Sequence, residues 1–294
     1  MSVILRTPRT KRPVRAGRAT DRTGVAAFLA LSFGGTWGWL WCATAVFGLS
    51  PLNPLLQVPA CCMPSIAAVV VRRWVTREGF ADAGLGLRLK TAWPYYLAAW
   101  LCPAALAACT LGLAVLFGLW HPRLSGLGGV LPGADDVLTV LGMMMASLVL
   151  TPLYWGEEFG WTSYLRPRLF GGALLPSSLV TGLIWAVWHV PLAFIGYVDF
   201  PNMALGLLVW TVSFQFQEVI LMWLYTRSGS IWVASLAHAG NNMVLSLVLG
   251  QVLDEGAGLG PTWPMVLSTI PLAVLSLAIT VHTRRRTAVR RTNQ

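Results

Sequence analysis

Long apolar stretches separated by short polar breaks run along nearly the whole chain. A membrane-crossing helix needs about 20 apolar residues, because each residue adds about 1.5 Å to the helix. We expect eight such spans, near residues 25–48, 55–71, 93–119, 137–165, 174–196, 203–226, 230–249 and 262–282. The pattern therefore predicts an all-α, polytopic membrane domain over residues 25–283, between a disordered basic tail at 1–24 and a basic tail at 284–294.

Composition agrees with a membrane-embedded chain. Hydrophobic residues make up 56% of the sequence and charged residues 11%, whereas a soluble domain carries about 25% charged residues. All five cysteines lie in apolar stretches, so they are interpreted as small buried hydrophobes rather than as disulfides or a zinc cluster.

The cations are distributed unevenly between the two ends of the predicted bundle. Eight spans place both tails and the loops 72–92, 166–173 and 227–229 on one face, and this face holds every Lys and Arg except Arg123. Cytoplasmic loops carry such an excess of Lys and Arg. We therefore expect both termini in the cytoplasm, a location in the plasma membrane, and tails that lie near anionic lipid. The same reasoning predicts no nucleic-acid partner.

Two adjacent carboxylates, Glu157 and Glu158, interrupt the fourth apolar stretch. Glu158 lies eight residues before Arg166, which corresponds to about 12 Å from the membrane interface in a helix. A charged side chain near the bilayer centre costs on the order of 3 kcal/mol, and helix packing does not call for ionisable acids. We therefore interpret the pair as part of a reactive or ion-binding site.

Other spans carry polar side chains at similar depth. Counted along their helices, His238 and Glu218 lie about 12 to 13 Å deep, and His189 and Asn242 about 18 Å deep. Trp185 precedes His189 by four residues, as His238 precedes Asn242, so each pair shares one helix face. We expect these groups to meet the glutamates around one cavity, with Glu218 bonding a catalytic histidine. For any histidine or asparagine alone, a hydrogen bond between helices is the alternative.

The order and spacing of these residues match a known pattern. They occur as Glu157-Glu158, Trp185-x-x-x-His189 and His238-x-x-x-Asn242. This arrangement resembles the three motifs of the CAAX protease and bacteriocin-processing family of intramembrane proteases, also called the CPBP or Abi family. The resemblance covers about residues 137–249, which we expect to be the catalytic core.

Two positions depart from the family pattern. Thr162 stands where the first motif has an arginine, and Trp185 stands where the second motif has a phenylalanine. Either aromatic ring can wall a pocket. Arg166, one turn beyond Thr162, is the candidate to replace the missing arginine.

The resemblance implies an endopeptidase that acts on peptides or proteins delivered at the cytoplasmic side of the membrane, in CAAX-type or bacteriocin-type processing. Hydrolysis needs an activated water, a base and donors to the oxyanion. In one version Glu157 is the base, His189 holds the water, and His238 and Asn242 face the oxyanion. In the other, His189, His238 and Glu157 bind a divalent metal such as zinc. The residues alone leave both open.

Two other functions remain open. A non-catalytic bacteriocin self-immunity or membrane-binding protein would share the motifs, and Thr162 keeps this alternative open. An ion-coupled transporter would also place glutamate and histidine at mid-depth, although the sequence shows no convincing internal repeat of the kind many transporters have.

Overall fold

A computed structural model describes residues 22–121, 136–255 and 258–292, and these residues form helices and no strand. Eight helices are long and apolar enough to cross a membrane. They are built on α1 (Arg22–Trp41), α2 (Pro54–Val70), α3 (Leu89–Leu116), α4 (Asp136–Glu158), α5 (Leu174–Phe194), α6 (Met203–Ser228), α7 (Ile231–Gly240) and α8 (Thr262–Thr292). The predicted all-α, polytopic fold is confirmed, with span ends shifted by a few residues.

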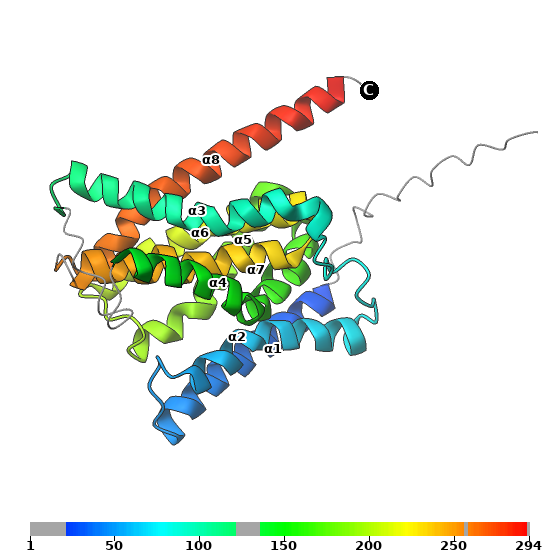
Figure 1. The fold of residues 1–294 in the computed structure, drawn as a ribbon. Helices are drawn as coiled ribbons and strands as arrows, with labels where there is room; N and C mark the ends of the chain where they lie inside the picture. The colour runs from blue at the N-terminus through cyan, green and yellow to red at the C-terminus, as the bar shows by residue number, and fades with distance from the viewer. Residues whose placement is uncertain (1–21, 122–135, 256–257, 293–294) are drawn as a thin grey trace, which may run out of the picture.

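The seventh span is the centre of the bundle. It continues from α7 through the π-helical segments η6 (Asn241–Val248) and η7 (Gly250–Glu255), and it is 67% buried, whereas the other spans are 17 to 44% buried. α7 packs against α3, α4 and α6, while α1 and α2 pair with each other and reach the bundle mainly through contacts of α2 with α4 (Figure 1). A polar residue on α7 is therefore enclosed on several sides.

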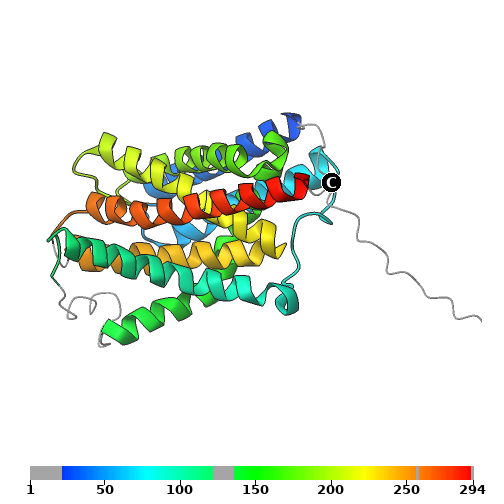
Figure 2. The ribbon, with the colours of Figure 1, turned by 90° about the horizontal axis from the view of Figure 1, so that it is seen from above.

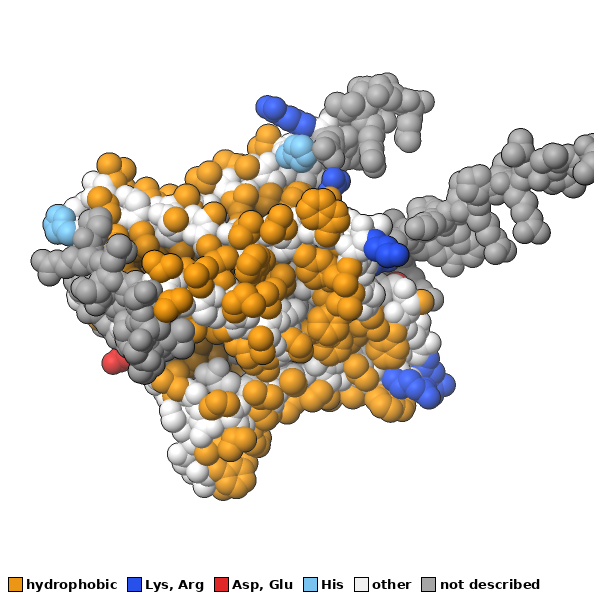
Figure 3. Space-filling model, viewed as in Figure 1, with side chains coloured by type: hydrophobic (Ala, Val, Ile, Leu, Met, Phe, Trp, Pro, Cys, Tyr) orange, Lys and Arg blue, Asp and Glu red, His pale blue; other side chains and the backbone are white. Residues whose placement is uncertain are grey.

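Both described ends of the chain lie at the same end of the bundle. α1 begins and α8 ends there, together with the loop between α2 and α3 (Figures 1 and 2). Figure 3 shows a broad apolar surface along the helices, with the Lys and Arg side chains of the view toward this end. We call it the terminal end, and the other the distal end.

The structure describes part of the two predicted tails. α8 continues as a helix to Thr292, through most of the expected basic tail at 284–294. The segment after residue 283 contains no Gly or Pro to stop a helix. The predicted disordered tail at 1–24 lies outside the described residues up to position 21, and α1 begins at Arg22.

Two ion pairs, each made by a buried or partly buried arginine, tie the loops of the terminal end together. Arg72 is fully buried and donates to the Asp82 carboxylate over 2.8 Å, and Arg168 pairs with Glu78. Burial acts to raise the pKa of Asp82, but the hydrogen bond and charge of Arg72 outweigh it, so this pKa lies below its usual value. The stabilisation from this pair is therefore present at neutral pH and lost as the pH falls through the lowered pKa.

Two glycines bring α4 and its π-helical continuation η3 (Phe159–Leu165) into backbone contact with α2. A Cβ atom on Gly156 would lie 2.8 Å from the carbonyl oxygen of Cys61. On Gly160 it would lie 2.5 Å from the Cβ atom of Pro64 and 2.8 Å from the Pro64 carbonyl. Small residues allow such close helix approach in membranes. The glycines on both sides of the two glutamates therefore fix the segment that carries them against α2.

We expect Gly160→Ala to lower the free energy of unfolding by about 1–3 kcal/mol, because the new methyl group would overlap the backbone of Pro64. Denaturant unfolding of the purified protein in detergent measures the change. Gly34→Ala is the matched control, since nothing lies within 4 Å of a Cβ atom there. Equal stability of the two variants would refute the close contact.

Candidate active site

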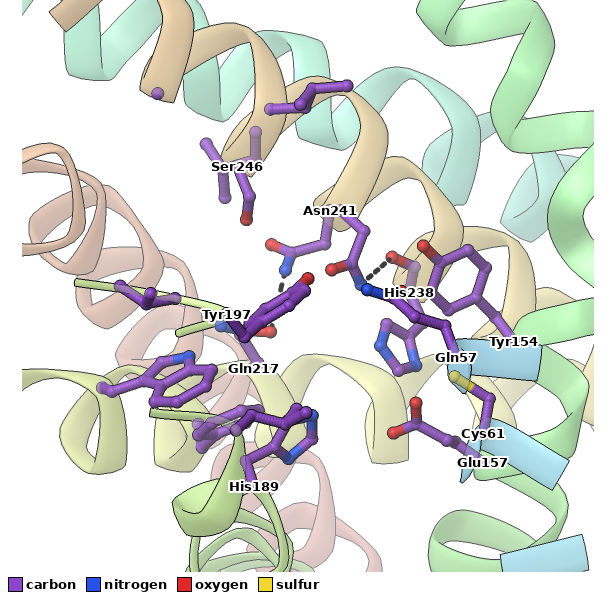
Figure 4. Close-up of a pocket in the computed structure, with 18 of the residues that line it drawn as sticks. Gln57, Cys61, Tyr154, Glu157, His189, Tyr197, Gln217, His238, Asn241 and Ser246 are labelled. Atoms are coloured by element: carbon purple, nitrogen blue, oxygen red, sulfur yellow. Dashed lines mark hydrogen bonds between the residues drawn. The ribbon is translucent and has the colours of Figure 1, made fainter. Parts of the chain in front are cut away.

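A cavity of about 690 Å³ lies among the helices and collects most of the predicted site residues. Its lining includes five of them, listed here in chain order: Glu157, Trp185, His189, His238 and Asn242. They come from α4, α5, α7 and η6 and point into the same cavity, where Figure 4 labels Glu157, His189 and His238. These five residues of the three motifs therefore share one cavity, whereas Glu158 is not among its lining residues. Their individual catalytic roles stay predictions.

Glu158 and His238 form a buried contact between α4 and α7. The Nδ1 atom of His238 lies 2.9 Å from the Oε1 atom of Glu158. Glu158 is 1% exposed and His238 is 3% exposed. The rings of Tyr154 and Trp185 lie 4.7 and 5.0 Å from the imidazole, between centroids. The carboxylate fixes one imidazole nitrogen, so the other is the one available to the cavity.

Glu157 is anchored by Trp185. The indole Nε1–H donates to the Oε2 atom of Glu157 over 2.8 Å, and Glu157 is 3% exposed. A phenylalanine, which the family pattern has at this position, has no such donor. Trp185 therefore does more than form a wall of the pocket, since its ring nitrogen positions the Glu157 carboxylate.

His189 is fixed by the same tryptophan. Its Nδ1 atom lies 2.9 Å from the carbonyl oxygen of Trp185. A carbonyl oxygen only accepts, so Nδ1 carries the proton, and in the neutral ring Nε2 is an acceptor. Glu157 and His238 both act electrostatically on His189. Its ring packs near Phe214, at 4.7 Å between centroids. An acceptor nitrogen suits a water molecule that must be held beside Glu157.

Amides add a second group of polar side chains to the cavity. Asn242 donates from Nδ2 to the carbonyl oxygen of His238 over 3.3 Å. Asn241 donates to Oε1 of Gln217 over 2.9 Å, and both residues line the cavity (Figure 4). Asn241 and Gln217 were not predicted. Each directly precedes a predicted site residue, and helical spacing places such a neighbour on another face. The change from α7 to π-helical geometry at Asn241 alters that phase.

Glu218 lies outside the cavity. It is fully buried, it is not among the lining residues, and neither carboxylate oxygen has a hydrogen-bond partner among the described residues. The expectation that it lines the cavity and bonds a catalytic histidine is therefore wrong. The cause is its direction on α6, because Gln217 occupies the cavity face at that level. Glu218 instead interacts electrostatically with Glu158 and Arg166.

Thr162, and not Arg166, bonds the glutamate pair. The Thr162 hydroxyl donates to Oε2 of Glu158 over 2.6 Å. Arg166 donates from Nε to the carbonyl oxygen of Thr162 over 3.3 Å, and its guanidinium lies 5.4 Å from the ring centroid of Tyr225. Glu158 is thus held at one oxygen by Thr162 and at the other by His238.

The proposed zinc ligands do not converge. Among the described residues, no three side chains of His, Cys, Asp or Glu lie in an arrangement that could hold a metal ion. Thus His189, His238 and Glu157 share the cavity without meeting as a ligand set in this structure.

The cavity reaches the distal end of the bundle. Leu52, which is 68% exposed, lines it from the loop before α2. Tyr197, Asp199 and Pro261 line it from the loops before α6 and α8. None of the described residues in the terminal-end loops is part of the lining. The described lining therefore leads toward the distal end, opposite the end that holds the two described chain ends.

Comparison with known proteins bears on this site at the level of the family. No curated protein matches the chain. Residues 137–244 match the model of a family described as type II CAAX prenyl endopeptidase, Rce1-like. The matched segment runs from α4 into η6 and includes both glutamates, both cavity histidines and Asn242. Residues 137–244 are thus similar to the Rce1-like family of type II CAAX prenyl endopeptidases, which confirms the resemblance that the motifs predict over this segment.

Proposed function

We propose that this chain is an intramembrane endopeptidase in which Glu157 activates water for attack on a peptide bond. The observation that carries the proposal is the position of the Glu157 carboxylate. It is buried in the cavity lining, anchored at one oxygen by Trp185, and in electrostatic contact with both histidines. The other oxygen is then the base for a water molecule in the cavity.

The two histidines act on opposite sides of the reacting carbonyl group. His189 accepts a hydrogen bond from the water through Nε2 and directs its lone pair, while Glu157 takes the proton as the C–O bond forms. His238, held at Nδ1 by Glu158, donates from Nε2 to the developing oxyanion, and Asn242 supplies an amide donor. When the C–N bond breaks, the proton on Glu157 passes to the leaving amine.

No step of this scheme runs through a metal, because the described side chains form no ligand set. The cavity is of a size usual for ligand sites. Its lining combines aromatic rings with amides, as a peptide needs for its apolar side chains and its backbone. The proposed substrate is therefore a peptide, or a protein segment, associated with the membrane.

Cleavage of a peptide library by the purified protein tests the proposal. The library contains CAAX-type prenylated peptides and leader-type peptides, and each reaction is run with and without a chelator. We expect cleavage products whose yield does not depend on the chelator. Loss of cleavage with the chelator and its return with zinc would refute the metal-free mechanism, and the absence of cleavage of any member would refute the protease.

We expect Trp185→Phe to lower kcat by about 10- to 100-fold, although it restores the residue of the family pattern. The ring stays aromatic, but Glu157 loses a hydrogen bond to a charged group, worth about 1.5–3 kcal/mol. Trp188→Phe is the matched control, because the indole nitrogen of Trp188 has no hydrogen-bond partner among the described side chains. Equal rates for both variants would contradict the anchoring role.

We expect Thr162→Val to lower kcat by about 10-fold or more, because the hydroxyl donor to Glu158 is removed with little change in shape. Thr162→Ser keeps the donor and should stay within a few-fold of the parent. Loss of activity in both variants would point to packing. If neither the two variants nor the parent protein cleaves any peptide, the non-catalytic alternative is favoured.

A further inference from the structure

The described lining of the cavity reaches exposed residues at the distal end. Lining residues follow the cavity from Glu157 outward to Gln57 and Leu52 on one side and to Asp199 and Pro261 on the other. Leu52 and Asp199 are exposed, and both lie in loops of the distal end. A molecule that reaches the glutamates between these two loops, which we call the mouth, therefore comes from the distal end.

A layer of buried side chains separates the cavity from the terminal end. All seven residues of η3 are buried, and Trp161, Tyr164 and Leu165 are fully inaccessible. On the terminal side of this layer, buried Arg72 bonds Asp82 and so holds the loop between α2 and α3 in place. Of the described residues between 72 and 88 and between 166 and 173, none lines the cavity.

Charge assigns the two ends to the two sides of the membrane. Every Lys and Arg that the structure describes lies at the terminal end, in helix ends or loops there. The cavity lining, in contrast, contains Asp199 and Glu157 and no described Lys or Arg. An excess of Lys and Arg marks the cytoplasmic side of a membrane protein. The terminal end is then cytoplasmic, and the mouth faces the opposite side.

We propose that the cavity opens to the non-cytoplasmic side of the membrane and takes peptides, or segments of membrane proteins, presented on that side. The opening itself does not depend on catalysis, whereas the statement about substrates rests on the proposed function. The family resemblance implies that substrates arrive from the cytoplasm. For this chain we expect them to arrive from the non-cytoplasmic side instead.

Thiol labelling tests the opening without reference to activity. The full chain is expressed in a bacterial host with its five native cysteines replaced by alanine, and single cysteines are introduced as Ser246→Cys or Ala81→Cys. Ser246 is exposed and lines the cavity (Figure 4), and Ala81 is exposed in a loop of the terminal end. A membrane-impermeant maleimide is applied to spheroplasts and to inverted vesicles. A variant with only native Cys61 is a second cavity probe that adds no new side chain.

We expect spheroplasts to be labelled at position 246 and not at 81, and inverted vesicles to show the reverse, with at least a 10-fold difference each way. Labelling of both positions from the same side would overturn the proposal. Labelling of position 246 only after detergent solubilisation would also overturn it, because the cavity would then be closed to both sides.

A second measurement separates the opening from the proposed function. Proteoliposomes of known orientation receive a cleavable peptide either outside or sealed inside. Cleavage only on the distal side supports both proposals, and cleavage only on the terminal side overturns the opening while the protease stands. Labelling as expected without any cleavage would refute the protease and leave the opening supported.

Discussion

Glu157→Gln is expected to lower kcat for peptide cleavage by a factor of about 10²–10⁴, the usual contribution of a general base. The amide has the shape of the carboxylate and still accepts the Trp185 hydrogen bond, so the cavity and KM should change little. Steady-state kinetics of the purified protein with the best library peptide measures both parameters.

Glu218→Gln is the matched control for Glu157→Gln. It changes the same functional group at a buried position that does not line the cavity. We expect kcat within a few-fold of the parent. A Glu157→Gln variant as active as Glu218→Gln would eliminate Glu157 as the base.

His238→Ala is expected to lower the free energy of unfolding by about 3–5 kcal/mol and to abolish cleavage. The substitution leaves the Glu158 carboxylate buried opposite an empty space, and an unpaired buried charge is strongly destabilising. Denaturant unfolding in detergent measures the stability, and the kinetic assay measures the activity.

The double variant Glu158→Gln/His238→Ala shows whether the loss comes from the pair. Removing the charge should recover part of the stability lost in His238→Ala, since residues in direct contact are non-additive. Cleavage should remain absent. The single variant Glu158→Gln completes the comparison. If the stability lost in the double variant equals the sum of the losses in the two single variants, Glu158 and His238 do not interact.

The fold was largely predictable because the bilayer acts on stretches of about 20 residues. Apolar length located all eight spans, including the short second span with Pro59 and Pro64 inside α2. Span ends were less predictable. α8 continues beyond residue 283 because Arg and Ala favour a helix and no glycine or proline interrupts it. The length of an apolar stretch does not show where a helix ends once it has left the membrane.

The site was predictable in its members and not in its details. Counting residues brought Glu157, His189 and His238 to similar depths, and the structure places all three in one cavity. The same count does not give helix rotation, so it missed Asn241 and placed Glu218 wrongly in the cavity. The Asn241 error lies at the start of the π-helical segment of the seventh span, where the phase of an α-helix no longer applies, whereas the Glu218 error comes from the rotation of α6.

Individual bonds at the site were also beyond the sequence. Thr162 looked like a defect because an arginine was expected, yet its hydroxyl bonds Glu158. Trp185 looked like a conservative ring exchange, yet its nitrogen bonds Glu157. The Trp185 bond depends on the approach of α5 to α4, which a pattern of residue types does not encode. The Thr162 bond joins residues four apart along one helical span, so it is local, and only the expected arginine drew attention away from it.

The closed layer below the cavity has a bioenergetic consequence. Trp161, Tyr164 and Leu165 separate the Glu157 carboxylate from the aqueous phase at the terminal end. In the proposed mechanism, the proton that Glu157 takes from water passes to the leaving amine and stays with products that leave on the distal side. Hydrolysis by this mechanism moves no net charge across the bilayer, so it neither draws on the membrane potential nor dissipates it.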